Sequence, residues 1–339
     1  MILWLAATAA QSEPLRIATF AAPLGRDGPG LLLRDLGRDD PQIDAVSAIV
    51  LDTNADILLL TDVDHDHDGL TLAALARRLN YPHGFALAPN TGLPTGLDLD
   101  GNSTLGEARD AQGYGRFPGD SGLAILSRYP IIADDVQDLS AMLWRDLPGA
   151  TLPEGPLGSA DIMAVQRLSS TGHWIVPIAA PGGPVTLMTY SATPPVFDGP
   201  EDRNGLRNRD ELRLWTHILD HDAPQDFIIL GNANLDPADG AGYRAAMQTF
   251  LADPRIIDPA PDSPGGLAAA DPDHAGDPAL DTADWPDDGP GNLRVSYVLP
   301  AVTWSVTGAG VVWPAGDDPL AQAIAVAGPH RMVWVDIAR

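Results

Sequence analysis

Residues 227–237 read Phe-Ile-Ile-Leu-Gly-Asn-Ala-Asn-Leu-Asp-Pro. The four apolar residues Phe227 to Leu230 predict a buried strand, and the glycine after them allows the backbone to turn sharply. Asn232 and Asn234 follow the end of this strand, which is where open α/β sheets hold their ligands. Because they are two residues apart, they point the same way if the backbone stays extended. On these residues alone, an Asn-rich turn without chemistry is an equal alternative.

The composition is that of a large folded protein with many turns. The chain has 339 residues, 45% of them hydrophobic, with 34 glycines and 32 prolines. This hydrophobic content supports a sizeable core, and the Gly and Pro content indicates long ordered loops. The sequence holds no cysteine, which rules out disulfides and thiolate metal sites.

The formal net charge is −26. Proteins that bind nucleic acids normally meet the phosphate backbone with Lys and Arg, so this charge disfavours a long nucleic acid as the partner. A small ligand is not disfavoured in this way. The sequence does not indicate an oligomeric state.

The first residues, Met1-Ile-Leu-Trp-Leu-Ala-Ala-Thr-Ala-Ala10, are apolar and end in small side chains. We interpret residues 1–14 as a short secretion signal or a disordered tail. A signal would make the protein secreted or periplasmic, although the stretch lacks the basic residues with which signals begin. Without a signal, a cytoplasmic location is expected. No later segment has the ~20 apolar residues that a membrane-spanning helix needs.

Further elements follow from apolar patterning. Strands are expected at residues 15–20, 55–64, 121–131, 170–177, 184–190, 293–299 and 328–336. Helices are expected within residues 34–54, 70–79 and 212–219, and the Asp- and Pro-rich residues 260–292 predict a long surface loop.

Several of these stretches resemble motifs of the endonuclease/exonuclease/phosphatase family, the metal-dependent phosphoesterases that include DNase I. Gly231-Asn-Ala-Asn234 is similar to the family's "strand, then Gly-Asp-x-Asn" motif. Ser121–Ile131 resembles "Gly-x-Ala-Ile-Leu-Ser-Arg-x-Pro", Leu293–Leu299 resembles "Arg-x-Asp-Tyr-Val-Leu", and Gly328–Asp336 resembles "Ser-Asp-His-Arg-x-Val".

The motifs occur in the family's order over nearly the whole chain. The resemblance therefore implies an α/β protein with a DNase I-like fold, a four-layer sandwich of two packed mixed β-sheets flanked by helices. It implies one domain over residues 15–339, with the motif residues at one edge of the sandwich.

The resemblance also implies a divalent cation, Mg²⁺ or Mn²⁺, if the protein is active. Asp62 stands where the family has a metal-binding glutamate, and Asp64 is the alternative ligand. Hard cations take carboxylate oxygens at about 2.0 to 2.6 Å, so the shorter Asp62 side chain needs the backbone or a water to close the gap.

The catalytic positions that the resemblance assigns are mostly changed. Asn234 and His330 match the family. The other positions differ. Ala21 stands where the family has an asparagine, and Ser191 stands where it has a histidine. Asn232 and Ser296 each replace an aspartate, and Pro329 replaces the acid before the last histidine.

These changes predict impaired or lost hydrolysis. Asn232 can neither accept a proton nor attract a cation as an aspartate does, and Ser191 cannot shuttle a proton near pH 7. With Ser296 in place of an aspartate, His330 loses the carboxylate that would fix its tautomer. Two alternatives stay open: an active hydrolase of a small phosphoester with a rearranged metal site of Asp62, Asp64 and His330, and a non-catalytic binding protein on the same fold.

Four other features have simple interpretations. His65-Asp-His-Asp-Gly69 could bind a transition metal, but a solvated turn before a helix is favoured. Gly96–Asn102 resembles a calcium loop, but its glycine is misplaced for an EF-hand. His173 is favoured as structural. Arg203, Arg207 and Arg209 could hold an anion, with pairing to neighbouring acids slightly favoured.

Overall fold

The computed structural model describes residues 14–339. The expected signal or tail therefore lies outside the described residues, except for Pro14. No helix in the described part of the chain combines the length and the apolar character needed to cross a bilayer.

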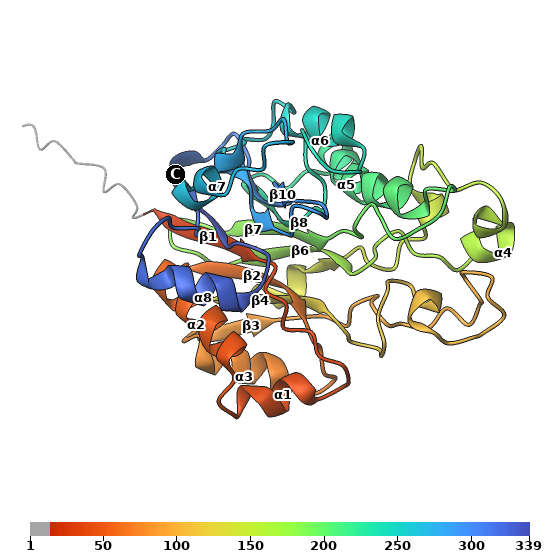
Figure 1. The fold of residues 1–339 in the computed structure, drawn as a ribbon, viewed down its shortest axis with the longest axis horizontal. Coiled ribbons are helices and arrows are strands. Elements are labelled where there is room, and N and C mark those ends of the chain that lie inside the picture. The colour runs from red at the N-terminus through yellow and green to blue at the C-terminus, as the bar shows by residue number, and fades with distance from the viewer. Residues whose placement is uncertain (1–13) are drawn as a thin grey trace, which may run out of the picture.

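Two mixed sheets form the centre of the molecule (Figure 1). The first has the strand order β12-β13-β1-β2-β4-β3, with bounds Ser305–Val311, Val333–Ala338, Leu15–Phe20, Ile57–Val63, Gly122–Ser127 and His83–Phe85. The second has the order β11-β8-β7-β6-β5, with bounds Ser296–Pro300, Phe227–Asn232, Val185–Ser191, Gly172–Ile178 and Gln137–Asp138. A small third sheet joins β9 (Ala283–Asp284) to β10 (Asn292–Leu293).

The two large sheets pack face to face through the largest hydrophobic core. In the first sheet, alternate strand residues enter this core, such as Ile17 of β1 and Ile57 and Leu59 of β2. In the second sheet, successive residues such as Ile228 and Ile229 of β8 belong to it. Side chains of successive strand residues point to opposite faces, which explains why Ala18 and Leu58 join a second core under the outer helices. The buried strands read as near-continuous apolar runs because both of their faces are covered.

Helices cover the outer faces and complete four layers (Figure 1). The first sheet carries α1 (Leu31–Leu36), α2 (Pro41–Thr53), α3 (Leu70–Arg78) and α8 (Pro319–Ala327), and the second carries α5 (Arg203–His221) and α6 (Arg244–Leu251). The remaining helices, α4 (Ala160–Met163) and α7 (Pro264–Ala268), are short and lie in connecting segments. The four-layer α/β sandwich predicted from the sequence is confirmed.

Two helix predictions were wrong in extent. The expected helix within residues 34–54 is two helices, because Asp40 caps α2 through the backbone N–H groups of Gln42 and Ile43, and Pro41 occupies its first turn. The helix expected at residues 212–219 extends over Arg203–His221. Its first half was missed because polar side chains, not apolar ones, fill its buried face there.

The topology brings several strand ends to one edge of the sandwich. β1 and β2 are parallel, and so are β7 and β8, so their carboxyl ends share an edge within each sheet. β4, β11 and β13 run antiparallel to these neighbours and begin at that same edge. The residues that the resemblance singles out lie at these ends.

Candidate active-site edge

The second sheet presents a row of three neutral side chains at its edge. Asn232 pairs with Ser191 of β7 on one side and with Ser296 of β11 on the other. Asn232 and Ser296 are buried, and Ser191 is partly buried. The structure therefore brings together three of the predicted catalytic positions, and none of them carries a charge.

Asn234 leaves the strand direction. β8 ends at Asn232, and Asn234 has a left-handed backbone with φ 49°, a conformation that Asn tolerates better than most residues. The Oδ1 atom of Asn232 accepts a hydrogen bond from the Asn234 N–H at 3.3 Å, and the Asn234 Nδ2 donates to the Ala192 carbonyl at 2.8 Å. The backbone is not extended here, so the parallel orientation expected for an extended chain does not apply. The Asn234 amide ties the turn after β8 to the turn after β7.

His330 is covered by residues 260–292. This stretch was expected to be a long surface loop, but it contains α7, β9 and β10, and some of its residues, such as Ala283, are buried. His330 forms an isolated β-bridge with Ala283. The centroids of the His330 and Trp285 rings lie 5.1 Å apart, in an edge-to-face arrangement. Burial, followed by the charge of Arg331, lowers the pKa of His330 to about 4, so its imidazole is neutral near pH 7. Its Nδ1 is buried with no hydrogen-bond partner among the described residues. The sequence feature that indicated this contact was Trp285, because no other Trp, Phe or Tyr occurs in this stretch, which is rich in Asp, Pro, Gly and Ala.

Ser296 has a buried hydroxyl that is likewise without a partner in the described chain. Its backbone N–H donates to Thr282 Oγ1 at 3.0 Å, and the N–H of Val295 donates to the same oxygen at 2.9 Å. Thr282 therefore fixes the start of β11 through the backbone, while the Ser296 side chain contributes no hydrogen bond.

The first sheet, in contrast, presents carboxylates at its edge. Ala21, directly after β1, is buried and offers no polar side-chain atom. Asp62 lies near the end of β2 at an irregularity in the pairing with β4, and its φ of 65° is left-handed. Bulges and strained backbone of this kind occur often beside functional sites because they re-aim a side chain.

The Asp62 carboxylate is directed at the loop after β1. A Cβ atom at Gly25 would come within 2.9 Å of Asp62 Oδ1 and 2.6 Å of Ser121 Oγ, so only glycine fits there without a shift. Burial, together with the charges of Asp120 and Asp64, raises the pKa of Asp62 to about 6 against a hydrogen bond from Ser121. Asp120 was not among the predicted site residues. The sequence feature that could have indicated Asp120 is its position just before β4, because β4 begins at the edge where β2 ends.

Asp64 is buried and its oxygens accept backbone hydrogen bonds. Oδ2 accepts from the Arg26 N–H at 3.0 Å, and Oδ1 accepts from the Ser121 N–H at 3.2 Å. Burial is the largest cause that raises the pKa of Asp64 to about 6, and Asp120 adds to it.

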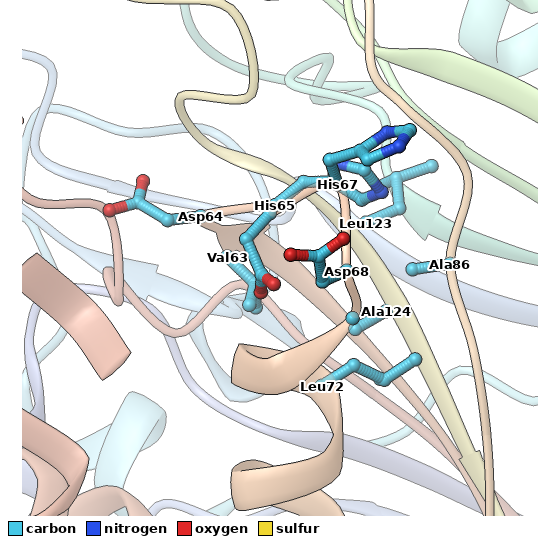
Figure 2. Close-up of a pocket in the computed structure, with 11 residues that line it drawn as sticks. Val63, Asp64, His65, His67, Asp68, Leu72, Ala86, Leu123 and Ala124 are labelled. Carbon is cyan, nitrogen blue, oxygen red and sulfur yellow. The ribbon is translucent and has the colours of Figure 1, made fainter. Parts of the chain in front are cut away.

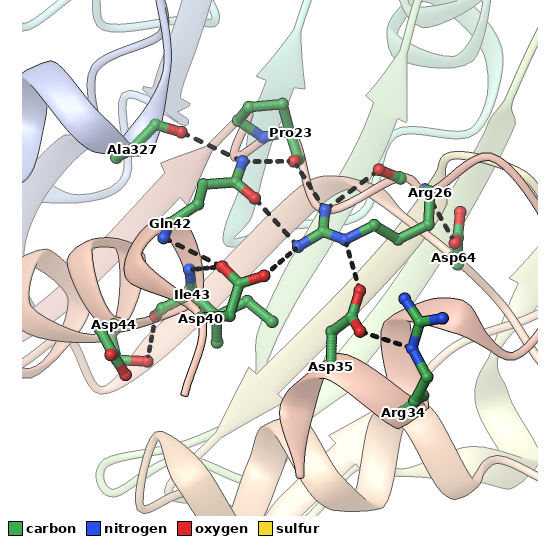
Figure 3. Close-up of polar contacts among 12 residues, drawn as sticks. Pro23, Arg26, Arg34, Asp35, Asp40, Gln42, Ile43, Asp44, Asp64 and Ala327 are labelled. Atoms are coloured by element: carbon green, nitrogen blue, oxygen red, sulfur yellow. Dashed lines mark hydrogen bonds and ion pairs between the residues drawn. The ribbon is translucent and has the colours of Figure 1, made fainter. Parts of the chain in front are cut away.

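The nearest arginine is engaged elsewhere (Figure 3). The guanidinium of Arg26 donates to Asp35, to Gln42 and to the carbonyls of Pro23 and Gly25. It makes no ion pair with Asp62 or Asp64. The charge of Arg26 lowers the pKa of both carboxylates, but by less than burial raises it.

The carboxylates do not gather into a preformed metal centre. Within residues 14–339, the one group of three or more metal-ligating side chains whose ligand atoms lie within 4.8 Å of one another is Asp98, Asp100 and Asp110. It includes two acids of the loop that resembles a calcium site, but its oxygens already accept backbone N–H groups, such as those of Gly101 and Leu99. Asp62, Asp64 and His330 form no such group, and the prediction that Asp62 and Asp64 bind a cation stays a prediction.

A cavity of about 190 Å³ lies beside the end of β2 (Figure 2). His65, His67 and Asp68 line it together with apolar side chains such as Leu72 and Leu123. Figure 2 shows the Asp64 carboxylate turned away from both imidazoles.

Asp66 caps α3 by accepting hydrogen bonds from the N–H groups of Leu70 and Thr71, both at 2.7 Å, so the expected turn before a helix is confirmed.

A buried polar network under α5, formed by Arg207, Asn208 and Glu211 and here called the α5 frame, holds the loops of the second sheet. Glu211 Oε1 accepts from the N–H and hydroxyl of Ser170 at 2.6 and 2.8 Å, and Oε2 accepts from the Thr193 N–H at 2.8 Å. Asn208 Nδ2 donates to the carbonyls of Thr193 and Ala233 at 2.7 and 2.8 Å. The α5 frame thereby fixes the turns that carry Ser191 and Asn234.

Arg207 completes this frame. It donates to the carbonyls of Leu168, Gln112, Arg167 and Ser169 at 2.7 to 3.0 Å. Burial lowers the pKa of Arg207 to about 10, which leaves it charged at neutral pH. The expected pairing of all three arginines with acids is therefore wrong for Arg207, whose partners are carbonyls, and right for Arg209, which contacts Asp210 at 3.0 Å.

His173 is fully buried, as a structural residue should be. Its ring packs on Tyr190 and Trp215, it contacts the Ser169 hydroxyl, and its Nε2 lies 3.2 Å from the Glu211 carbonyl. Burial lowers its pKa to about 3, so it stays neutral.

Comparisons with known proteins agree with this architecture. The family model for the endonuclease/exonuclease/phosphatase family matches residues 25–333. An endonuclease/exonuclease/phosphatase from Beutenbergia cavernae has a TM-score of 0.58 at 18% identity, with 96% of this chain and 72% of that chain covered. No curated protein matches the sequence.

Two further solved structures show the same fold. Sphingomyelinase C from Streptomyces griseocarneus has a TM-score of 0.51 at 17% identity and covers 96% of this chain and 99% of that one. The 3′ phosphatase NExo from Neisseria, bound to a product DNA hairpin, has a TM-score of 0.51 at 16% identity, with 95% and 98% covered. Since the family model spans most of the chain, this protein belongs to the endonuclease/exonuclease/phosphatase family.

Proposed function

We propose that this protein is a phosphoesterase-fold member whose hydrolysis is impaired or lost, and that its active-site edge still binds a small phosphorylated ligand. One observation carries this proposal. Ser191, Asn232 and Ser296 stand side by side at the edge of the second sheet, at positions where the resemblance expects a histidine and two aspartates. The backbone of the site is retained while its charged side chains are replaced.

The replacements remove separate steps of the chemistry. No group in this row can accept a proton from an attacking water, because an amide and two hydroxyls are poor bases near pH 7. His330 is neutral and has no carboxylate on Nδ1 to fix its tautomer. The loss of one oriented proton-transfer group typically costs about 10²- to 10⁴-fold in rate. Losses within one catalytic unit do not add, but turnover should be very low.

The divalent cation that the family implies fits these residues poorly. Asp62 has the right ligand chemistry, but both oxygens of Asp64 already accept backbone N–H groups, and Asn232 and Ser296 supply no charge. A bound metal therefore has no part in the proposed function.

A second candidate function is a working hydrolase that uses Asp62, Asp64 and His330. It is favoured by two acids at the end of β2, Asp62 and Asp64, whose pKa values are raised mainly by burial and further by the charge of Asp120, since a bound cation would stabilise their charged forms. The ligand in either case is expected to be small, because the net charge of −26 repels a long nucleic acid.

The test compares the unmodified chain with a variant carrying Ala21→Asn, Ser191→His, Asn232→Asp and Ser296→Asp. Both are assayed on bis(4-nitrophenyl) phosphate with Mg²⁺ or Mn²⁺, after circular dichroism shows that both are folded. We expect turnover in the variant to exceed that of the unmodified chain by about 10²-fold or more. The same variant with Asn234→Ala is the control and should lose the gain.

High turnover by the unmodified chain would contradict the proposal. If Asp62→Asn then abolished that turnover, the second candidate function would replace it. A Mn²⁺ titration followed by electron paramagnetic resonance adds a readout that does not depend on the substrate: weak binding in the unmodified chain and tighter binding in the variant support the proposal.

A further inference from the structure

Three arginines gather around residues 166–169, next to the active-site edge. Arg203 and Arg207 are four residues apart in α5 and so lie on one face of the helix. Arg207 is buried and donates hydrogen bonds to carbonyls of this segment. Arg203 donates a hydrogen bond from Nη2 to Gln166 Oε1. Arg167 belongs to the segment itself.

Arg167 and Arg203 have only neutral partners. Arg167 donates to Asn90 Oδ1 at 2.7 Å, and Arg203 donates to the side-chain oxygen of Gln166. Neither forms an ion pair with any carboxylate in residues 14–339, although the chain has 46 acids and most of its other arginines are paired. Glu201 and Asp198 influence Arg203 from beyond ion-pair distance, and their oxygens accept the N–H groups of Gly199 and Asn204.

The neutral partners hold both guanidinium groups in place without cancelling their charge. Asn90 is buried and its Nδ2 donates to the carbonyls of Ser140 and Ser169, both at 2.8 Å. Gln166 is fully buried and its Nε2 lies 3.1 Å from the Gln112 carbonyl. Arg203 and Arg167 are only partly buried, and their remaining N–H groups have no partner within residues 14–339. The Nε of Arg203 is enclosed and is also without a partner there. Guanidinium groups bind oxyanions by two parallel hydrogen bonds, and both arginines keep N–H groups for this, while Glu201 and Asp198 offset part of the charge of Arg203.

This arginine pair adjoins the edge of the second sheet. Gly172 pairs with Ser191, and the Ser170 hydroxyl donates to the Ser191 carbonyl at 3.3 Å. The segment that carries Arg167 thus continues directly into the strand beside Ser191. Glu211 joins Ser170 to Thr193, so the α5 frame fixes Arg203 and the edge as one unit.

We propose that Arg167 and Arg203 form a phosphate-binding subsite beside the active-site edge. The ligand is a small phosphomonoester whose dianionic group is held by both guanidinium groups. The inference rests on the proposed function in taking phosphate as the anion, and it adds the residues that recognise it. Electrostatic repulsion by the rest of the protein makes non-specific binding of a dianion weak, so measurable binding reports this local site.

The experiment measures binding of inorganic phosphate and of phenyl phosphate by ³¹P NMR line broadening, at low ionic strength and pH 7.5. Arg167→Gln and Arg203→Gln are each expected to weaken binding about tenfold or more, because each removes a charge-assisted hydrogen bond. Arg203→Lys should retain part of the affinity. The control is Arg209→Gln on the same helix, whose arginine pairs with Asp210 and lies 4.9 Å from the Tyr243 ring, and it should bind like the unmodified chain.

Thermal unfolding of each variant shows whether the fold persists. Unchanged phosphate binding in the folded Arg167→Gln/Arg203→Gln double variant would overturn the subsite, and so would the absence of binding to the unmodified chain at tens of millimolar phosphate. Loss of binding in Asn234→Ala but not in the double variant would also overturn it and would leave the proposed function standing. Binding that depends on the arginines in a protein whose restored variant never turns over would support the subsite while the proposed function fails.

Discussion

The α5 frame and the active-site edge are both built from buried polar residues, but they differ in how those residues are satisfied. In the frame, Arg207 makes four hydrogen bonds and Glu211 accepts three. At the edge, the Ser296 hydroxyl and the His330 Nδ1 have no partner among the described residues, whereas in the frame only the Oδ1 atom of Asn208 lacks one. Buried polar groups are normally paired. The charged groups of the frame therefore help to hold the loops of the second sheet, whereas these two groups of the edge contribute no hydrogen bond to the fold.

The largest expected effect tests the frame. Arg207→Ala leaves Glu211 buried without its charged neighbour and removes donors from four carbonyls. We expect a loss of about 3–5 kcal/mol in the free energy of unfolding, measured by urea denaturation. Arg38→Ala, at an exposed arginine, is the control and should change stability by less than about 0.5 kcal/mol. Similar small effects for both variants would show that the frame is not what holds these loops.

A smaller effect tests the carboxylates of the first sheet. The folded pKa values of Asp62 and Asp64, about 6, lie above the ordinary value of 3.8. The folded state therefore binds more protons than the unfolded state between about pH 4 and pH 6. The stability contributed by the protonated groups is full below pH 4 and is lost as the pH rises through 6.

The corresponding variant is Asp62→Asn. At pH 7 we expect it to be more stable than the unmodified chain by about 1–2 kcal/mol, after allowance for solvent screening, and the difference should shrink at pH 5. Urea denaturation at both pH values measures this. A variant that is less stable at pH 7 would mean that the Asp62 charge is favourable in the fold, and the contrast between a strained edge and a relaxed frame would no longer hold.

The smallest effect is expected for Ser296→Ala. Because the hydroxyl is buried and unpaired, its removal should change the free energy of unfolding by less than about 0.5 kcal/mol or stabilise the protein slightly. Thermal unfolding of the two proteins side by side is sufficient. A loss above about 1 kcal/mol would reveal a partner for this hydroxyl and would remove one of the two orphaned groups on which the comparison depends.

Much of the fold could be predicted from the sequence because its strands are apolar runs in a recognisable order. β1 was predicted at its observed bounds, and Ser191, Asn232 and Ser296, which the resemblance assigns to the site, lie together. The first half of α5 could not be predicted from apolar spacing, because residues such as Asn208 and Glu211 fill its buried face.

The residues that surround the site could not be predicted from the sequence either. Trp285 reaches His330 across 45 positions of chain, and Asp120 joins Asp62 through strand pairing, so neither contact follows from local spacing. The sequence did not show that Arg167 and Arg203 lack ion pairs, because acids lie next to Arg203 in the sequence. Only the folded structure shows that the carboxylate oxygens of Glu201 and Asp198 accept backbone N–H groups instead.

The fit of Gly25 against Asp62 has a consequence for protein engineering. A Cβ atom at position 25 would lie 2.9 Å from Asp62 Oδ1 and 2.6 Å from Ser121 Oγ. Because both atoms are the ends of side chains, an alanine at position 25 would displace them rather than the backbone. The orientation of the Asp62 carboxylate can therefore be altered from position 25 while Asp62 itself is left unchanged.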